Sequence, residues 1–230
     1  MNWIVNFLTS SIGRKVIMSL TGLFLILFLV VHLAGNLQLL TNDGGEAFNT
    51  YAYMMTHNPL IVAISYGNYF FIILHAIVGI LMYFKNRKAK GSRYAVSGNS
   101  GETSWSSKNM ALLGTLILAF IFIHMGDFWF KMKFGEMPDV TSAALGMPVK
   151  DLFTRVSTAF DNPLIVIIYL IGQIVLGFHL WHGFQSAFQT LGLNHSKYNP
   201  IITFVGKAYS IIIPLLYAII PLYFHFVILK

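Results

Sequence analysis

The sequence predicts an all-α integral membrane protein, a bundle of five transmembrane helices forming a single domain over residues 1–230. Three observations lead to this prediction. Hydrophobic residues make up 56% of the chain and charged residues only 10%, where a soluble domain has about 25%. The mean hydropathy is +0.68. The few charges cluster between long apolar runs, so we expect those runs to face lipid.

Five apolar stretches are long enough to cross a hydrocarbon core of about 30 Å, which takes about 20 helical residues. We expect the spans near residues 16–40, 60–84, 109–131, 162–187 and 207–228. The polar segments between them are predicted to be loops, namely residues 42–45, 85–107, 132–161 and 194–200. Pro214 and Pro221 lie in the fifth span, where proline is tolerated and can kink the helix.

Basic residues are divided unevenly between the two sides that alternating spans define. The richer side carries Arg14, Lys15, Lys85, Arg87, Lys88, Lys90, Arg93, Lys108, Lys197 and Lys207. The other side carries Lys131, Lys133, Lys150, Arg155 and Lys230. The positive-inside rule therefore places the richer side, with the N-terminus, in the cytoplasm. Glu102 is the one acidic residue on that side, and the others lie outside: Asp43, Glu46, Asp127, Glu136, Asp139, Asp151 and Asp161. The net charge of +7 then follows from topology, and nucleic-acid binding is not expected.

Histidine is the residue type that points to a function. The sequence has no cysteine, which excludes disulfides, thiolate metal sites and iron–sulfur ligation by this chain. Four predicted spans carry a histidine deep inside, namely His32, His75, His124 and His179. Ionisable side chains are costly in the hydrocarbon core and by default mark a functional site.

Counting along the spans places these histidines in two layers. His32 and His124 fall in the outer half of the membrane and His75 and His179 in the inner half, with the layers on the order of 14 Å apart. An iron porphyrin with two imidazole ligands needs one neutral nitrogen on each side of its plane, which two facing helices can supply. Each pair can therefore hold one haem. A lone intramembrane histidine can equally serve as an interhelical hydrogen-bonding residue, but four in two layers favour haem.

The remaining histidines are placed differently. His182 lies about 60° around the helix from His179, so only one of the two is expected to bind iron, and the spacing leaves the choice open. We expect His57 in an outer loop, His195 in an inner loop and His225 near the outer end of the fifth span. These three positions are interfacial, which makes them weaker candidates for metal ligation.

Three segments carry a family resemblance. The first is Ser11-Ile12-Gly13-Arg14-Lys15 with Ser19-Leu20-Thr21-Gly22 and His32-Leu33-Ala34-Gly35-Asn36. The second is His75-Ala76-Ile77-Val78-Gly79, and the third is His179-Leu180-Trp181-His182-Gly183 running on to Leu191-Gly192. Together they resemble the cytochrome b membrane anchor of succinate dehydrogenase and fumarate reductase, in its single-chain, five-helix, di-haem form. The likeness covers nearly the whole chain.

The resemblance implies both ligands and partners. In the family a glycine follows the ligand by four positions, which selects His179 over His182, and the implied pairs are His75 with His179 and His32 with His124 around two haems b. The implied partners are a flavoprotein and an iron–sulfur subunit on the cytoplasmic face of a bacterial inner membrane. The chain would then be the electron-transfer and quinone-binding subunit of a succinate:quinone oxidoreductase, not catalytic alone, with menaquinone as the expected quinone.

The prediction of a quinone-binding site rests on fewer residues than the prediction of the haem ligands. Some di-haem members carry a glutamate two residues before the fourth ligand, where this chain has Gly177. Quinone chemistry exchanges protons, so an acid or imidazole near the headgroup is expected. Glu46 and His57 are the candidates for this role.

One alternative belongs to a different class, and two others are cytochromes b of other complexes. A small proton-coupled transporter component would use intramembrane histidines as relays, although the five spans show no repeat. The cytochrome b subunit of another membrane oxidoreductase, such as a hydrogenase or formate dehydrogenase, also holds haem between helices, and the segments at residues 11–22 and 179–192 argue against it. The cytochrome b of quinol–cytochrome c oxidoreductases places two ligands on each of two helices, a pattern that is absent here.

Overall fold

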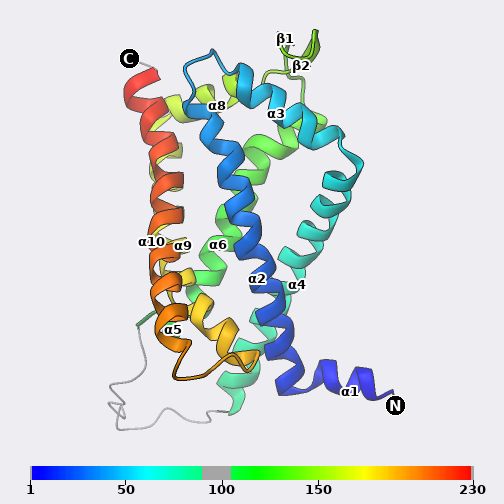
Figure 1. Cartoon of the computed structure of the whole chain (residues 1–230), viewed down its shortest axis with the longest axis vertical. Coiled ribbons are helices and arrows are strands. Elements are labelled where there is room, and N and C mark those ends of the chain that lie inside the picture. The colour runs from blue at the N-terminus through cyan, green and yellow to red at the C-terminus, as the bar shows by residue number, and fades with distance from the viewer. Residues whose placement is uncertain (1, 90–104, 229–230) are drawn as a thin grey trace.

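The computed structural model describes residues 2–89 and 105–228, and these are almost entirely helical (Figure 1). The helices are α1 (Trp3–Thr9), α2 (Ser11–Asn36), α3 (Glu46–His57), α4 (Pro59–Ala89), α5 (Trp105–Lys108), α6 (Met110–His124), α7 (Lys131–Phe134), α8 (Leu152–Asp161), α9 (Pro163–Thr190) and α10 (Asn199–Tyr223). Three shorter helical segments continue some of them, η1 (Leu37–Leu40), η2 (Met125–Phe130) and η3 (Phe224–Ile228). Lys90, Arg93, Glu102 and Lys230, which entered the charge comparison, lie outside the described residues.

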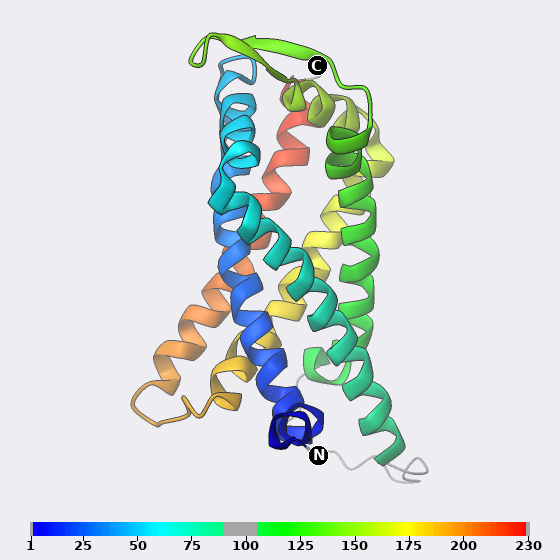
Figure 2. The same cartoon turned by 90° about the vertical axis from the view of Figure 1, so that its right-hand side faces the viewer.

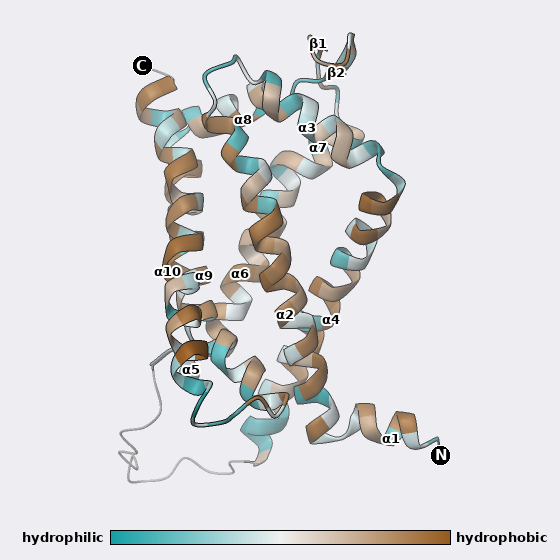
Figure 3. Cartoon of the chain, in the orientation of Figure 1, coloured by the Kyte–Doolittle hydropathy of each residue, from teal (hydrophilic) through white to brown (hydrophobic). Residues whose placement is uncertain are grey.

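Five helices are long and apolar enough to cross a membrane, as predicted: Ser11–Leu40, Pro59–Ala89, Met110–Phe134, Pro163–Thr190 and Asn199–Ile228. In Figure 3 the middle of these helices is hydrophobic, while hydrophilic residues gather at their ends. The chain is therefore a multi-pass membrane protein by length and composition. The last span begins earlier than predicted, because Pro200 sits in the first turn of α10, where its missing N–H costs nothing.

The two ends of the bundle differ. α3, α8 and a β-hairpin lie at one end, while α1 and α5 lie at the other (Figures 1 and 2). We call these the hairpin end and the α1 end. In the described residues every acidic side chain belongs to a segment at or near the hairpin end, whereas the α1 end is basic. A buried apolar cluster that includes Leu39, Phe160 and Phe224 closes the hairpin end beneath α8.

The prediction of a loop over residues 132–161 is wrong, and the fold is not purely α-helical. Strands β1 (Asp139–Ser142) and β2 (Met147–Lys150) form an antiparallel hairpin. Gly146 supplies the positive φ of +65° that its turn needs. The hairpin is followed by α8, whose first turn is capped where Asp151 accepts a hydrogen bond from the Thr154 amide at 3.1 Å.

The segment before the second span also differs from the prediction. Glu46 and His57 were expected in a loop, but they are the first and last residues of helix α3. This helix lies across the hairpin end (Figures 1 and 2). Asn49 fixes it to α8, because its side chain donates to Asp151 at 3.1 Å and accepts from the Phe153 amide at 2.9 Å.

Gly177 brings α9 close to α10. A Cβ at this position would lie 3.1 Å from the Ser210 carbonyl oxygen and 3.7 Å from Pro214 Cγ. Because Pro214 has no N–H, the Ser210 carbonyl lacks its usual helical donor, and glycine lets the neighbouring helix approach there. α10 itself is a continuous helix through Pro214 and Pro221. Residue 177 is thus a helix-packing position in this chain.

Candidate functional site

A cavity of about 2700 Å³ runs along the inside of the bundle. Typical ligand pockets measure about 300–1,000 Å³, so this cavity can take more than one large ligand. Its walls come mainly from α2, α4, α6 and α9, and most of its lining is apolar. Within the described residues no aspartate or glutamate lines it, whereas Lys15, Arg87 and Lys108 do so at the α1 end.

All four intramembrane histidines line this cavity, each from a different helix. The rings of His75 (α4) and His179 (α9) have their centres 6.3 Å apart. The rings of His32 (α2) and His124 (α6) have theirs 5.8 Å apart. We call these the α1-end pair and the hairpin-end pair. The structure thus brings together the same two pairs that counting along the spans predicts.

The distance between the pairs can be measured along three helices. On α2, Gly22 faces His75 and stands ten residues before His32. On α6, Gly114 faces His179 and stands ten residues before His124. Ten residues correspond to a rise of about 15 Å. The third helix, α9, places Tyr169, which contacts His124, ten residues before His179.

Two glycines make room for the α1-end pair. A Cβ on Gly22 would lie 3.3 Å from His75 Cε1, and one on Gly114 would lie 3.8 Å from His179 Cε1. Larger side chains at these positions would push into the imidazoles. In the sequence Gly22 stood out as part of a segment that carries the family resemblance, and Gly114 did not stand out, because its partner is distant in the sequence.

His75 has a partner that orients its ring. Its Nδ1 lies 2.9 Å from the hydroxyl oxygen of Thr21. That hydroxyl donates to the Ile17 carbonyl at 2.7 Å, so we assign it as the acceptor of the Nδ1 proton. Nε2 of His75 then keeps its lone pair for a metal. Sequence reasoning missed this role, since Thr21 counted there only as part of a family segment.

The other three histidines are held differently. Nδ1 of His124 lies 3.2 Å from the phenol oxygen of Tyr169, which can fix its tautomer in the same way. His32 stacks on Phe28 with ring centres 5.2 Å apart. Nδ1 of His179 is buried and has no hydrogen-bond partner among the described residues. The only signal for the role of Tyr169 in the sequence is that it is a polar residue inside an apolar span.

Each pair offers two nitrogen ligands and little else. Within the described residues no group of three or more His, Cys, Asp or Glu side chains is placed to hold a metal ion. A bare ion between two imidazoles would therefore lack ligands, whereas a planar macrocycle brings its own in-plane nitrogens. Two metal–nitrogen bonds of about 2 Å, with each nitrogen about 1 Å from its ring centre, put the ring centres about 6 Å apart. Both pairs have this spacing.

The remaining histidines lie elsewhere. His182 also lines the cavity, but in the described part of the chain the ring that faces His75 is that of His179. His195 lies in the turn between α9 and α10, where its Nδ1 accepts from the Lys197 amide at 3.2 Å. His225 lies in η3, and its Nδ1 is 2.9 Å from the carbonyl oxygen of Phe160 in α8.

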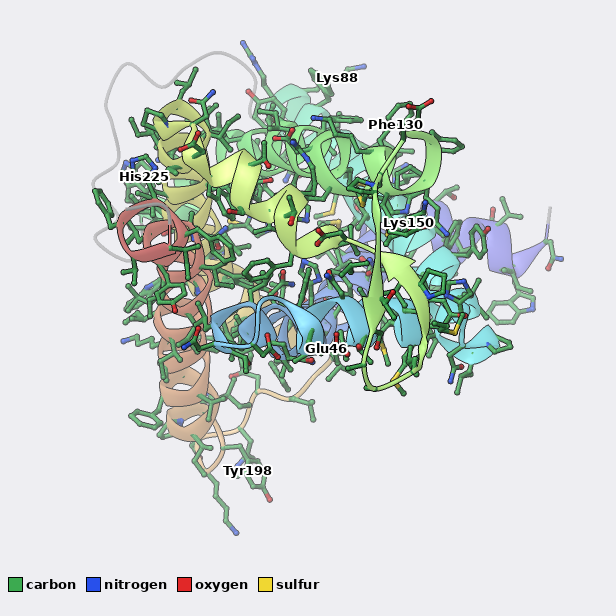
Figure 4. The ribbon with its side chains drawn as sticks, turned by 90° about the horizontal axis from the view of Figure 1, so that it is seen from above. Glu46, Lys88, Phe130, Lys150, Tyr198 and His225 are labelled. Carbon is green, nitrogen blue, oxygen red and sulfur yellow. The ribbon has the colours of Figure 1, made fainter. Side chains whose placement is uncertain are left out.

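Glu46 and His57, the predicted quinone-site residues, both lie outside the cavity lining of the described chain. The Glu46 carboxylate accepts from Ser142 Oγ at 2.8 Å and from the Ala144 amide at 3.1 Å. Figure 4 shows Glu46 of α3 beneath the hairpin. His57 is exposed, and its ring stacks on Tyr53 with centres 3.9 Å apart. Contact of either residue with quinone stays a prediction.

Glu46 attaches the hairpin to α3 in a pH-dependent way. The hydrogen bond from the Ala144 amide, followed by that from Ser142, lowers the pKa of this carboxyl below its usual range. A depressed folded-state pKa gives stability that is present above the unfolded pKa and lost as the pH falls through the folded value. At neutral pH the group stays ionised and exchanges protons poorly.

We therefore expect the hairpin to detach in acid. A nitroxide label at Leu145, in the hairpin turn, should be immobile at neutral pH and gain mobility as the pH falls through the lowered pKa of Glu46. Glu46→Ala, which removes the oxygen that accepts from Ser142 and Ala144, should make the label mobile at every pH. A label that stays immobile in Glu46→Ala at neutral pH would show that the carboxylate does not hold the hairpin.

The fold and the cavity together define the class: a multi-pass membrane protein with two facing histidine pairs inside its bundle. None of the family models, curated proteins or solved structures with which the chain was compared matches it. The resemblance to a family therefore stays a prediction from the sequence segments named above.

Proposed function

We propose that this chain is the di-haem cytochrome b membrane anchor of a succinate:quinone oxidoreductase. In this function it carries electrons between an iron–sulfur subunit and a membrane quinone, expected to be menaquinone. One observation carries the proposal. Two histidine pairs line one large apolar cavity, and within each pair the two rings have the spacing of a bis-imidazole iron site.

The residues fit two haems b. His75 and His179 would hold one iron, and His32 and His124 the other. When bound, haem supplies a one-electron carrier whose potential depends on its ligands and surroundings. Thr21 and Tyr169 orient their histidines, and the cavity walls are mostly apolar. Lys15, Arg87 and Lys108 can neutralise the carboxylates of a haem at the α1 end.

The charge distribution supports an orientation. Most basic side chains of the described residues lie at the α1 end, and the acidic ones lie at or near the hairpin end. By the positive-inside rule the α1 end, with the N-terminus, faces the cytoplasm of a bacterial inner membrane. A flavoprotein and an iron–sulfur subunit would then dock at the α1 end, and His75 and His179 would form the pair nearer to them.

An optical spectrum with haem quantification tests the proposal. The purified chain should show a Soret band and contain two haems per chain. No Soret band, or one haem per chain, would overturn the two-pair assignment. The alternative function, a proton-coupled transporter component, would then be favoured. Purification from the native membrane should also bring down a flavoprotein and an iron–sulfur subunit, and a chain that never does so is not this anchor.

Thr21 offers a separate test of how the α1-end pair is built. Thr21→Val keeps the shape of the side chain but removes the acceptor of the His75 Nδ1 proton. Loss of such a partner typically weakens metal affinity by about 10–100-fold. We expect the rate of haem loss from one of the two sites to rise accordingly, measured by transfer to a haem-scavenging protein.

Ser19→Ala is the matched control for this test. Ser19 lies on the same helix and lines the cavity, but its hydroxyl donates to the Lys15 carbonyl at 3.0 Å. Haem loss should stay at the wild-type rate in this variant. Equal effects of Thr21→Val and Ser19→Ala would show that Thr21 only packs.

A further inference from the structure

Two buried amide side chains line the cavity without partners for their oxygens. Asn68 on α4 is 5% exposed and Gln173 on α9 is 8% exposed, and both belong to the cavity wall. Among the described residues no donor reaches Asn68 Oδ1 or Gln173 Oε1. An amide without partners is costly in a membrane span, because lipid offers no hydrogen bonds. These two groups therefore need a ligand from within the cavity.

The two amides lie at a common height, between the histidine pairs. α4 and α9 both run from the hairpin end to the α1 end (Figure 1). Asn68 precedes His75 by seven residues, and Gln173 precedes His179 by six, which places both about 9–11 Å along the helix from the α1-end pair. Gln173 also follows Tyr169, the partner of His124, by one helical turn. We call Asn68 and Gln173 the amide layer.

The ligand of the amide layer must donate hydrogen bonds to the two oxygens. The apolar side chains around it have no donor, and a haem has none to give either, because its ring nitrogens bind iron and its ionised carboxylates only accept. Water both donates and accepts, and it occupies buried sites that offer it two to four polar partners. The amide N–H groups of the same side chains supply further contacts.

We propose that Asn68 and Gln173 bind ordered water in the middle of the membrane, between the two histidine pairs. This water binding does not depend on the proposed function. A consequence for redox chemistry does depend on it: water dipoles favour the charged state of a nearby iron site over the neutral one. The layer lies nearer the hairpin-end pair, so it should lower the potential of that site more.

Radiolytic footprinting tests water binding directly, with the full chain in lipid nanodiscs. Radicals formed from ordered water oxidise the side chains next to it. Ile72 and Leu176, which line the cavity one turn from Asn68 and Gln173, should be labelled in the wild-type chain. Asn68→Leu with Gln173→Leu should reduce that labelling several-fold. Leu118→Ile, another change in the cavity wall, should leave it unchanged.

Two results would overturn the proposal. One is equal labelling of Ile72 and Leu176 in the wild-type chain and the double variant. The other is a higher Tm for Gln173→Leu, because removal of an unsatisfied amide from a dry site stabilises a protein, whereas loss of a hydrated one does not.

A redox titration of the haem-loaded protein tests the consequence. The double variant should raise both midpoint potentials, and that of the hairpin-end site more. Unchanged potentials despite lost labelling would overturn this consequence alone. Labelled residues in a chain that binds no haem would keep the water layer and refute the proposed function.

Discussion

Replacing His75 or His179 by alanine is expected to remove one haem and leave the other bound. The two rings form one site with centres 6.3 Å apart, so loss of either leaves iron with a single protein ligand. Replacing His32 or His124 should remove the other haem, since their centres are 5.8 Å apart. Within each pair the two variants should give the same spectrum and retain the same midpoint potential. Haem quantification and a redox titration of each variant provide the measurement.

His182→Ala is the control for this series. His182 lies one turn from His179 and lines the same cavity, so the substitution disturbs the neighbourhood equally. Both haems should stay bound. Loss of a haem in His182→Ala, with none lost in His179→Ala, would reverse the choice between these two residues.

Arg155→Met is expected to destabilise the protein and to loosen the hairpin-end pair. Arg155 on α8 donates from Nη2 to the Asp127 carboxylate at 2.8 Å and from Nε to the Asp127 carbonyl at 3.0 Å. Asp127 lies in the π-helical segment η2, which directly follows His124. Both side chains are about one-fifth exposed, so removal of the arginine should cost about 2–3 kcal/mol. Chemical unfolding in detergent and the rate of haem loss measure the two effects.

A double-mutant cycle separates the ion pair from packing. Asp127→Asn combined with Arg155→Met should cost less than the two single changes added together, because no uncompensated charge is left. Lys131→Met is the matched control: Lys131 also lies near Asp127, at 3.4 Å, but is half exposed, so its loss should cost at most about 0.5 kcal/mol. Additive losses in the cycle would mean that Arg155 acts through its aliphatic stem alone.

The spans could be predicted because length and hydropathy alone define them. The grouping of the histidines could also be predicted, since a helix rises by a fixed distance per residue and antiparallel spans reverse its direction. The pairs that the structure brings together, His32 with His124 and His75 with His179, are those the sequence suggested. Iron ligation by them stays a prediction.

The hairpin end could not be predicted, because long-range contacts determine it. Residues 132–161 carry no strong periodicity, and their structure depends on contacts such as Glu46 with Ser142 and Asn49 with Asp151. The same holds for Thr21 and Tyr169, whose roles require knowing which histidine lies opposite. The amide layer was missed because Asn68 and Gln173 fit no spacing motif.

The ten-residue offset constrains how this chain can change in evolution. On α2 and on α6, the glycine that faces one histidine and the histidine of the other pair stand ten residues apart. An insertion or deletion of one residue between them would turn one of the two away by about 100° and shift it by about 1.5 Å. Loops of this protein can vary in length, but the segments 22–32 and 114–124 should have fixed lengths. Both segments fix the same distance between the two histidine pairs.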